Sequence, residues 1–418
     1  MEIVLALAAG VSLLLLAWQH RVARAFPVHE RRVPLEGSEA VTILKPLRGV
    51  DATTRECLES WVRQEHEGPM QILFGVESAE DPAVALVETL RTDHPDRDIR
   101  MVVCPERPVP NPKVAMLLQM ESCVTTPWVV IADADVRAPA DLLRQELSRL
   151  RNPSVGLVYC LFRVVSRDGW PGRVEELLVN ADFWGQVLQG RSLGRIQFAL
   201  GAVVMTRRSA LASIGGLARV GHHLADDYEL GRRMGRAGLR VELATVVVDC
   251  LVPPGLSWGT VWRRQLRWAR TIRFCQPVPY AFSILANATL WPVLWGIAMA
   301  GSSLAPGLLL AATLLRLAVA RGLHRRMTGG RSGAGIVWCM PGIDLLRAVI
   351  WAFAWIGRGV VWQDRRYRVT AGGRLVAVGS GSARRRSRPT EAPACVAATA
   401  RRETRTGDVL TGPGTGST

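Results

Sequence analysis

The chain has 418 residues, 49% of them hydrophobic, which is enough for one large domain or two modest ones, and its formal net charge is +16 at pH 7. The arginines gather beside hydrophobic segments, at 21–32, 321–331 and 384–405, rather than along one folded face, which favours a membrane surface over nucleic acid as the anionic partner. The eight cysteines show no CxxC or Cys/His spacing, which argues against a zinc site or a disulfide framework.

The chain begins with an apolar segment. Residues 3–18 carry no charge, and Arg21 follows closely. This segment is short for a membrane span, although flanking residues can reach the interface. A cleaved signal peptide is the alternative, but Met1-Glu2 supplies no basic n-region and the positive charge follows the apolar run. We expect residues 1–20 to form an uncleaved transmembrane anchor, with the N-terminus outside and the next domain in the cytoplasm.

Short apolar runs then alternate with amphipathic stretches. The strand-like runs are 41–44, 71–76, 99–103, 128–132 and 155–159, and the helix-like stretches are 53–64, 82–92, 113–122 and 139–150. This alternation predicts an α/β domain over residues 38–256, with a mostly parallel sheet covered by helices on both faces. Such sheets bind ligands at the carboxyl ends of their strands. Residues 174–194 are less regular.

Residues 257–276 carry tryptophans and arginines at helical spacing, which predicts an amphipathic basic helix suited to the bilayer surface. The helix contains the run Arg264-Gln265-Leu266-Arg267-Trp268. A planar guanidinium suits phosphate recognition, and a tryptophan here can close a sugar-acceptor pocket or lie among lipid headgroups. Membrane anchoring by the whole helix is the alternative, and we expect some arginines to face lipid and at least one to face a diphosphate.

Further apolar segments occupy residues 281–370. Residues 281–300 and 304–320 predict a hairpin of two membrane spans. Residues 336–356 are interrupted by proline and charged residues, so a span, a re-entrant segment and an interfacial helix are all open, and the positive charge on both sides favours a segment that does not cross. Residues 380–418 are rich in Arg, Thr, Gly, Ser and Ala, which predicts a disordered basic tail.

Two acidic residues follow the strand-like run 128–132. Asp133 and Asp135 form a D-x-D, and alternate side chains of an extended segment point the same way. Mg²⁺ or Mn²⁺ takes few carboxylates together with diphosphate oxygens. A solvated loop pair is the alternative, but the position at the end of a buried strand favours a metal site.

Three further charged positions lie at the starts of expected helices. Helix capping is the alternative role for Asp226-Asp227, but capping by Asp226 would still leave Asp227 free to act as a general base towards an acceptor hydroxyl. Glu80-Asp81 either caps a helix or contacts a nucleotide. Lys113 is poorly placed for the helix dipole, which indicates an anionic partner, with a solvated lysine as the alternative.

Together these motifs resemble those of the ceramide glucosyltransferases and their bacterial relatives, which include the hopanoid-biosynthesis glycosyltransferases. The stretches that carry the resemblance are 44–51, 80–83, 111–113, 133–135, 225–228, 264–268 and 362–373. They occur in this order over residues 41–373. Residues 174–223, where acceptor contacts are expected, resemble the family poorly.

The resemblance implies a GT-A fold and a glycosyl transfer that inverts the anomeric configuration. The matching positions are Lys45, Asp81 and Lys113 near the nucleotide, Asp133 at the metal and diphosphate, Asp227 as the presumed base, and Arg264, Arg267 and Trp268 near the diphosphate and acceptor. Asp135 stands where the eukaryotic ceramide enzymes have a non-acidic residue.

We therefore expect a metal-dependent enzyme, using Mg²⁺ or Mn²⁺, in a bacterial inner membrane. It would transfer glucose or N-acetylglucosamine from a UDP-sugar to a hydroxyl of ceramide, a hopanoid or a similar lipid at the cytoplasmic face. A processive polysaccharide synthase is one alternative, but it needs a transmembrane channel, for which the C-terminal segments are few. A membrane protein that binds lipid without catalysis is the other, with the acidic residues serving only as helix caps.

Overall fold

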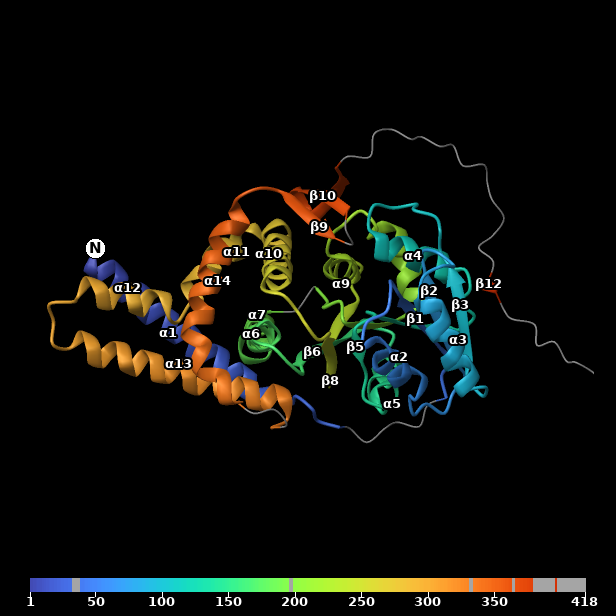
Figure 1. The fold of residues 1–418 in the computed structure, drawn as a ribbon, viewed down its shortest axis with the longest axis horizontal. Helices are drawn as coiled ribbons and strands as arrows, with labels where there is room; N and C mark the ends of the chain where they lie inside the picture. Colours follow the sequence, from blue (N-terminus) through green and yellow to red (C-terminus); the bar gives the residue numbers. More distant parts are fainter. Residues whose placement is uncertain (32–37, 195–197, 331–333, 363–364, 379–394, 397–418) are drawn as a thin grey trace, which may run out of the picture.

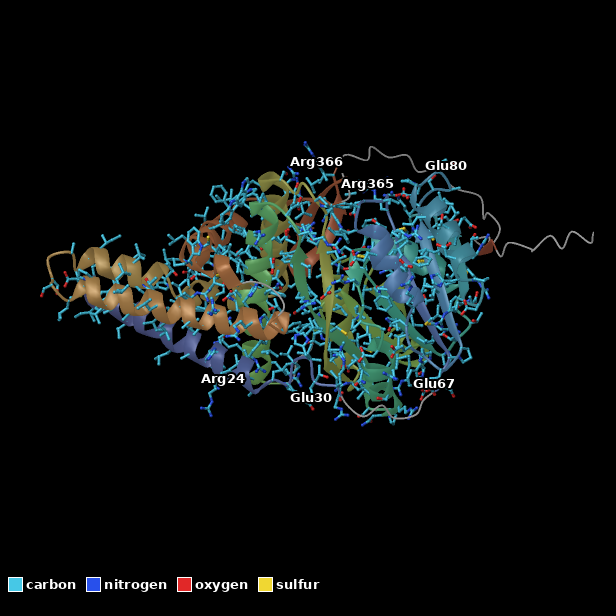
Figure 2. All side chains as sticks on the ribbon, turned by 60° about the horizontal axis from the view of Figure 1, so that its bottom comes forward. Arg24, Glu30, Glu67, Glu80, Arg365 and Arg366 are labelled. Carbon is cyan, nitrogen blue, oxygen red and sulfur yellow. The ribbon has the colours of Figure 1, made fainter. Side chains whose placement is uncertain are left out.

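The computed structural model describes residues 1–31, 38–194, 198–330, 334–362, 365–378 and 395–396. It consists of an α/β body and a group of helices that extend from one side of it (Figure 1). The extended helices are α1 (Glu2–Ala25), α12 (Leu290–Ala298) and α13 (Ala305–Thr328). Arg24 and Glu30 lie where α1 reaches the body, and Glu67 lies on the body itself (Figure 2).

The body is built on a sheet with strand order β12-β3-β2-β1-β4-β7-β6-β8-β5. Its strands are β1 (Val41–Pro46), β2 (Met70–Val76), β3 (Asp98–Val103), β4 (Trp128–Ala132), β5 (Val136–Arg137), β6 (Val155–Ser166), β7 (Val203–Arg207), β8 (Arg240–Val252) and β12 (Cys395–Val396). The predicted α/β fold is confirmed, with β3, β2, β1 and β4 all parallel. Beyond β4 the sheet is mixed, because β7 runs antiparallel to both β4 and β6.

Helices cover both faces of the sheet, as predicted. The helices of one face are α2 (Thr54–Val62), α3 (Ala83–Asp93) and α5 (Leu142–Glu146), and those of the other are α4 (Pro112–Glu121), α8 (Arg208–Ser213) and α9 (Asp226–Arg236). Successive strand residues alternate between the two cores, so that Ile43 belongs to the first and Leu44 to the second. Short 3-10 turns lie at Leu147–Arg151 and Leu217–Arg219.

The irregular stretch near residue 180 is a helix interrupted by a π-helix. It comprises α6 (Trp170–Leu178), the π-helix η2 (Val179–Phe183) and α7 (Trp184–Ser192). In η2 the Asn180 side chain accepts a hydrogen bond from the backbone nitrogen of Val164 at 2.9 Å and donates one to its carbonyl oxygen at 2.8 Å. The wider turn breaks the 3.6-residue period, which is why the sequence pattern there is irregular.

Within the described residues, the helices long and apolar enough to cross a membrane are Glu2–Ala25, Ala305–Thr328 and Gly335–Trp355. The last comprises the 3-10 turn η5 (Ala334–Cys339) and α14 (Met340–Trp355). Helix α14 crosses α13 and runs beside α10 (Trp258–Cys275), the helix expected at 257–276 (Figure 1). The rings of Trp262 on α10 and Phe353 on α14 meet edge to face, 5.5 Å between centroids. Whether residues 336–356 cross a membrane stays a prediction.

The segment expected to form a span at 281–300 is a bent pair of helices, and whether the pair crosses a membrane stays a prediction. The segment consists of α11 (Pro277–Phe282), a 3-10 turn (Ser283–Ala286) and α12, and the two helical pieces are bent by 55°. The Asn287 side chain accepts a hydrogen bond from the backbone nitrogen of Leu290 at 2.9 Å and donates one to the carbonyl oxygen of Asp344 at 2.7 Å. This side chain caps α12 and fixes the break against α14.

The end of the region expected to lie in the membrane, 281–370, is also different. It forms a small antiparallel sheet of β9 (Gly359–Trp362), β10 (Arg365–Thr370) and β11 (Arg374–Ala377), with a 3-10 turn at Ala371–Gly373. The backbone nitrogen of Leu224 donates to the carbonyl oxygen of Gly373 at 2.9 Å, which attaches this sheet to the loop before α9. The tail predicted at 380–418 lies outside the described residues, except for Cys395–Val396.

Candidate active site

The D-x-D motif lies in the turn that follows β4. The turn is closed by a hydrogen bond from the backbone nitrogen of Val136 to the carbonyl oxygen of Asp133 at 3.3 Å. The Asp133 side chain is 39% exposed and Asp135 is also exposed, as a ligand-binding pair requires. Although Asp135 is exposed, the protein packed around it partly desolvates its carboxylate and raises its pKa, and the negative charge of Asp133 raises the pKa further.

Lys45 supports this turn from within the protein. It is fully buried, and its Nζ donates to the carbonyl oxygen of Asp133 at 2.6 Å. Burial lowers the pKa of Lys45 to about 8, although the nearby carboxylates of Asp135 and Asp133 oppose the shift. This position holds the D-x-D backbone in place, and a contact of Lys45 with a nucleotide stays a prediction.

Lys113 joins two of the acidic motifs. Its Nζ lies 2.6 Å from Oδ1 of Asp133 and 3.5 Å from Oδ2 of Asp226. Burial lowers the pKa of Lys113, but the attraction of the two carboxylates outweighs it and the pKa is raised. The anionic partner expected for Lys113 is therefore present as two carboxylates, and its contact with a nucleotide stays a prediction. Asn111, just before it, caps α4 by accepting from the backbone nitrogen of Val114 at 3.1 Å.

Asp227 begins α9 beside this pair. Burial, together with the negative charge of Asp226, raises the pKa of Asp227 to about 7 against the opposing charge of Lys113. The N-cap residue of α9 is Ala225, and Oδ1 of Asp227 accepts a hydrogen bond from the backbone nitrogen of Tyr228 at 2.8 Å in the first turn of the helix. A Cβ on Gly201 would lie 2.8 Å from Oδ2 of Asp227, so a larger residue at position 201 would displace the Asp227 carboxylate.

The arginines of α10 complete the cluster. Burial lowers the pKa of Arg267, as does the neighbouring Arg264, whereas Asp133, Asp227 and Asp135 raise it. Arg267 is thus electrostatically coupled to all three carboxylates, although these come from two distant parts of the chain. Its guanidinium also lies over the Trp362 ring of β9, 5.9 Å from the centroid. We call Asp133, Asp135, Asp227, Lys113, Arg264 and Arg267 the active-site cluster.

The Trp268 side chain lies among other aromatic rings. Its ring lies 6.3 Å from that of Phe162 and 6.2 Å from that of Phe183, centroid to centroid. These rings pack around the apolar contact of Val179 and Val252. Trp268 therefore fixes α10 against η2 and β6, and its contact with an acceptor stays a prediction.

Asp81 follows β2 at the edge of the sheet where Asp133 follows β4, and its carboxylate binds backbone nitrogens. Both of its carboxylate oxygens accept from the backbone nitrogen of Gly49 at 3.0 Å, and Oδ1 also accepts from that of Ala83 at 2.9 Å. The capping role is therefore observed, and a nucleotide contact stays a prediction. Glu80 is exposed at the outer surface of the body (Figure 2).

Glu175 is a site residue that the sequence motifs did not indicate. It lies on α6, is completely buried, and accepts a hydrogen bond from Nη1 of Arg264 at 3.0 Å. Burial raises the pKa of Glu175, while Arg264 and Arg267 lower it. The signal available in the sequence was a glutamate between Val174 and Leu177 on the apolar face of a helix.

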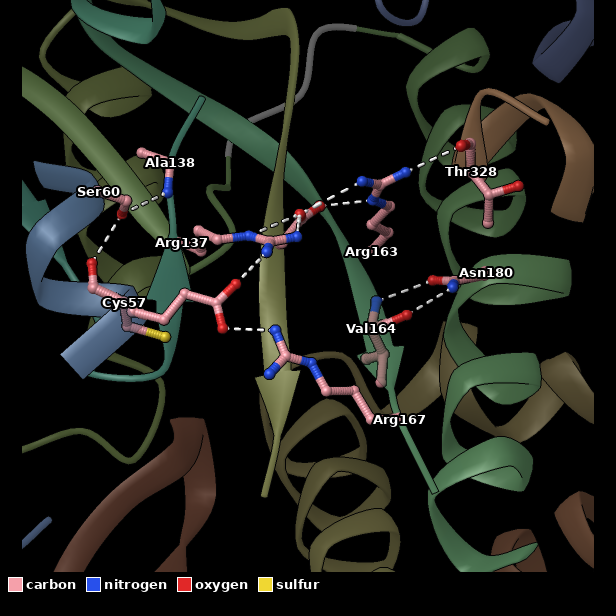
Figure 3. A network of polar contacts seen from close by, with 11 residues as sticks. Cys57, Ser60, Arg137, Ala138, Arg163, Val164, Arg167, Asn180 and Thr328 are labelled. Atoms are coloured by element: carbon pink, nitrogen blue, oxygen red, sulfur yellow. Dashed lines mark hydrogen bonds and ion pairs between the residues drawn. The ribbon is translucent and has the colours of Figure 1, made fainter. Parts of the chain in front are cut away.

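A polar network behind the cluster joins the sheet to the helical part (Figure 3). Asp249 on β8 pairs with Arg137 on β5 and with Arg163 on β6, and Arg137 also pairs with Glu56 on α2. Burial opposes ionisation of Asp249, but the hydrogen bonds and charges of the two arginines hold its pKa below the usual range. Arg163 also donates to the carbonyl oxygen of Thr328 at 2.9 Å, which attaches the end of α13 to the sheet.

A divalent cation fits the exposed pair Asp133 and Asp135. Two carboxylates of like charge, one with a raised pKa, favour a cation that stabilises both in the ionised form. Among the described residues, no group of three or more His, Cys, Asp and Glu side chains is arranged to hold a metal ion. Substrate oxygens and water would have to supply the other ligands, which is how Mg²⁺ is usually held beside a diphosphate.

Comparisons with known proteins identify the family and the fold of the chain. The model of glycosyl transferase family 21 matches residues 3–375. Ceramide glucosyltransferases 1 and 3 of Caenorhabditis elegans are 24% identical over 221 residues and 23% identical over 206 residues. The matches cover 53% and 49% of this chain and 47% and 44% of those proteins, so the chain spans about half the length of the curated relatives it matches.

A solved structure shares the fold. It is the mannosyltransferase PcManGT from Pyrobaculum calidifontis, in complex with GDP-Man and Mn²⁺, which is 20% identical. The TM-score is 0.52, and the match covers 83% of this chain and 96% of that one. This likeness confirms the expected GT-A-like fold of the α/β body.

Proposed function

Because the chain belongs to glycosyl transferase family 21, we propose that it is a membrane-bound inverting glycosyltransferase that transfers a hexose from a UDP-sugar to a hydroxyl group of a lipid. The observation that carries this proposal is the contact of Lys113 with both Asp133 and Asp226, at 2.6 Å and 3.5 Å, which joins the D-x-D turn to the start of α9. Carboxylates that can bind a cation, a titratable base and a pair of arginines are the groups that this transfer needs. The similarity to ceramide glucosyltransferases supports glucose as the sugar and a ceramide-like lipid as the acceptor. N-acetylglucosamine as the sugar and a hopanoid-type lipid as the acceptor are the other candidates that we propose.

Asp227 is proposed as the base. Its pKa of about 7 lies near the working pH, where a base both holds the correct charge and accepts a proton readily. The acceptor hydroxyl would transfer its proton to Asp227 as its oxygen bonds to the anomeric carbon. The bond from that carbon to the diphosphate breaks on the opposite side, so UDP leaves with the bonding electrons and the configuration inverts.

The departing UDP carries growing negative charge. Arg264 and Arg267 would pair with the diphosphate oxygens through their planar guanidinium groups. Asp133 and Asp135 would hold Mg²⁺ or Mn²⁺, which acts as a Lewis acid on the same oxygens when bound. Lys45 keeps the D-x-D backbone at a constant position throughout, because it bonds to the carbonyl oxygen of Asp133 from inside the body.

The helices supply the route for the lipid. Helices α1, α13 and α14 include the segments long and apolar enough to cross a membrane, and α14 packs beside the arginine-bearing α10. A lipid hydroxyl at the membrane surface would thus reach the active-site cluster without leaving the bilayer completely. The arginines beside the apolar segments favour the cytoplasmic face, in a bacterial inner membrane.

The substitution Asp227→Asn tests this proposal. The variant keeps the shape of the side chain but cannot accept the proton, so turnover should fall by about 10²–10⁴-fold while UDP binding persists. Mass spectrometry of a mixed lipid extract incubated with several UDP-sugars measures the product, and Asp96→Asn, at an exposed position, is the matched control. Normal turnover of Asp227→Asn would remove the base assignment, and a long polymer in place of one glycosylated lipid would indicate a processive synthase.

A further inference from the structure

Glu175 is a buried carboxylate with one free oxygen. Its side chain has no exposure to solvent, Oε1 binds Arg264, and Oε2 has no hydrogen-bond partner among the described residues. Burying a carboxylate without full pairing is costly, and such groups usually serve a purpose other than stability. Its partner Arg264 is 30% exposed and belongs to the active-site cluster.

Arg264 has a second set of carboxylates within reach of its charge. The positive charge of Arg264 lowers the pKa of Asp135, against burial and the charge of Asp133, which raise it. Without Glu175, Arg264 would lose the carboxylate that binds it, and Asp135 is an acidic group that already feels the charge of this arginine. A guanidinium bound there would compete with a cation for the D-x-D oxygens and would no longer be free to bind a diphosphate.

We propose that Glu175 is a positioning residue, which holds Arg264 apart from the D-x-D carboxylates so that the arginine binds the donor diphosphate and the carboxylates bind the cation. This inference rests on the proposed function. A bound nucleoside diphosphate attracts two positive charges, the Arg264 guanidinium and the metal ion. In this proposal the buried Glu175 side chain keeps these two charges apart.

The π-helix that follows α6 attaches the C-terminal end of the helix that carries Glu175. Asn180, in the π-helix that follows α6, is hydrogen bonded to the backbone of β6. Asp182, in the same turn, pairs with Arg347 of α14 and lies 3.4 Å from Arg316 of α13. Helix α6 is thus attached to the sheet and to the membrane helices, and Glu175 cannot follow Arg264 if the arginine moves.

The test is calorimetric binding of UDP with Mn²⁺ to the full-length protein in detergent. Glu175→Gln should weaken UDP binding about tenfold, the usual scale for losing one charge-assisted hydrogen bond. It should also raise the Mn²⁺ concentration for half-maximal binding. A merely structural role would lower the melting temperature without moving that Mn²⁺ concentration. The matched control is Glu176→Gln, because Glu176 pairs with His324 on α13 instead, and it should bind both as the wild type does.

A double-mutant cycle with Arg264→Gln separates direct from indirect action. If Glu175 acts through Arg264, adding Glu175→Gln to Arg264→Gln should change UDP binding no further. Additive losses in the double variant, or an unchanged Mn²⁺ requirement in Glu175→Gln, would overturn the inference. Should Glu175→Gln fail to fold, Glu175→Asp keeps the charge one methylene further away and should give a smaller loss of the same kind. Failure of the wild type to bind UDP would instead reject the proposed function itself.

Discussion

At the scale of single residues, the active-site cluster is a set of opposed charges that tune one another. Lys113 is shared by Asp133 and Asp226, so it offsets part of the repulsion among the carboxylates. The offset is incomplete at Asp227, which is surrounded by protein and lies next to Asp226, and its pKa of about 7 follows. A carboxyl group that still titrates near neutral pH can accept a proton from a hydroxyl and release it to water after each turnover.

This pKa predicts the pH dependence of the reaction. Asp227 is protonated, and therefore inactive as a base, below its pKa, so kcat/KM should rise with pH through about 7 and then level off. Asp226→Asn removes the neighbouring charge that raises the pKa and releases Lys113 to lower it, so the rise should move to lower pH. The measurement is kcat/KM for the UDP-sugar at saturating Mn²⁺. A range of roughly pH 5 to 9 covers the rise of the pH–rate profile on both sides of the pKa. An unmoved rise in Asp226→Asn would show that another group is titrating.

At the scale of elements, the end of α13 is attached to the sheet by polar side chains. Arg163 of β6 reaches the carbonyl oxygen of Thr328, and His29 lies 2.9 Å from the carbonyl oxygen of Met327. These carbonyl groups belong to the last turn of the helix, which has no further helical partners for them. The helix that extends furthest from the body is therefore held at its inner end by hydrogen bonds from the body itself (Figures 1 and 3).

Arg163→Ala should loosen this attachment. The side chain is 13% exposed, so its loss should lower the free energy of unfolding by about 2 kcal/mol, because Asp249 then keeps only one of its two arginine partners. The melting temperature in detergent measures the effect. Arg167→Ala is the control, since Arg167 is 55% exposed and pairs only with Glu56 in this network, and its melting temperature should hardly change. Equal decreases in the melting temperatures of the two variants would contradict the role of Arg163 in attaching α13.

At the scale of the whole molecule, a buried charge network holds the helices together. Arg316 of α13 binds both oxygens of Asp344 on α14 at 2.7 Å and lies 3.4 Å from Asp182 of η2. Thr289, at the break before α12, donates to the same carboxylate at 2.7 Å, and Gln19 of α1 donates to the carbonyl oxygen of Asp182 at 3.0 Å. Charges in apolar surroundings are expensive unless paired, so this network fixes one arrangement of these helices.

Arg316→Met should therefore be strongly destabilising. Arg316 is 2% exposed, and its removal leaves Asp344 buried without its main cation, at a cost of about 3–5 kcal/mol. Adding Asp344→Leu removes the stranded charge and should recover much of the loss. Melting temperatures in one detergent compare the variants, with Arg321→Met, at an exposed position on the same helix, as the control. A double variant no more stable than Arg316→Met would show that the pairing is not the cause.

Much of the body could be predicted from local patterns. The sequence pattern placed β1 to β4 and α2 to α4 within a few residues of their observed bounds. It could do so because the order of apolar and polar residues along the chain shows which faces of a strand or helix are buried. The same patterns placed Asp133 at a strand end and Asp227 at a helix start. The break at Asn287 could not be predicted, because it depends on a hydrogen bond to Asp344 in another helix.

By itself the sequence determined the elements, their order and the residue types at their ends, because these depend on neighbours along the chain. The tertiary structure alone decided which charges meet. Glu175 and Arg264 are 89 positions apart, and Lys45 and Asp133 are 88 apart. Whether a buried charge supports the backbone, holds an arginine or faces a ligand is set by the few groups packed around it, and the chain brings those together only when the sheet, α6 and α10 have assembled.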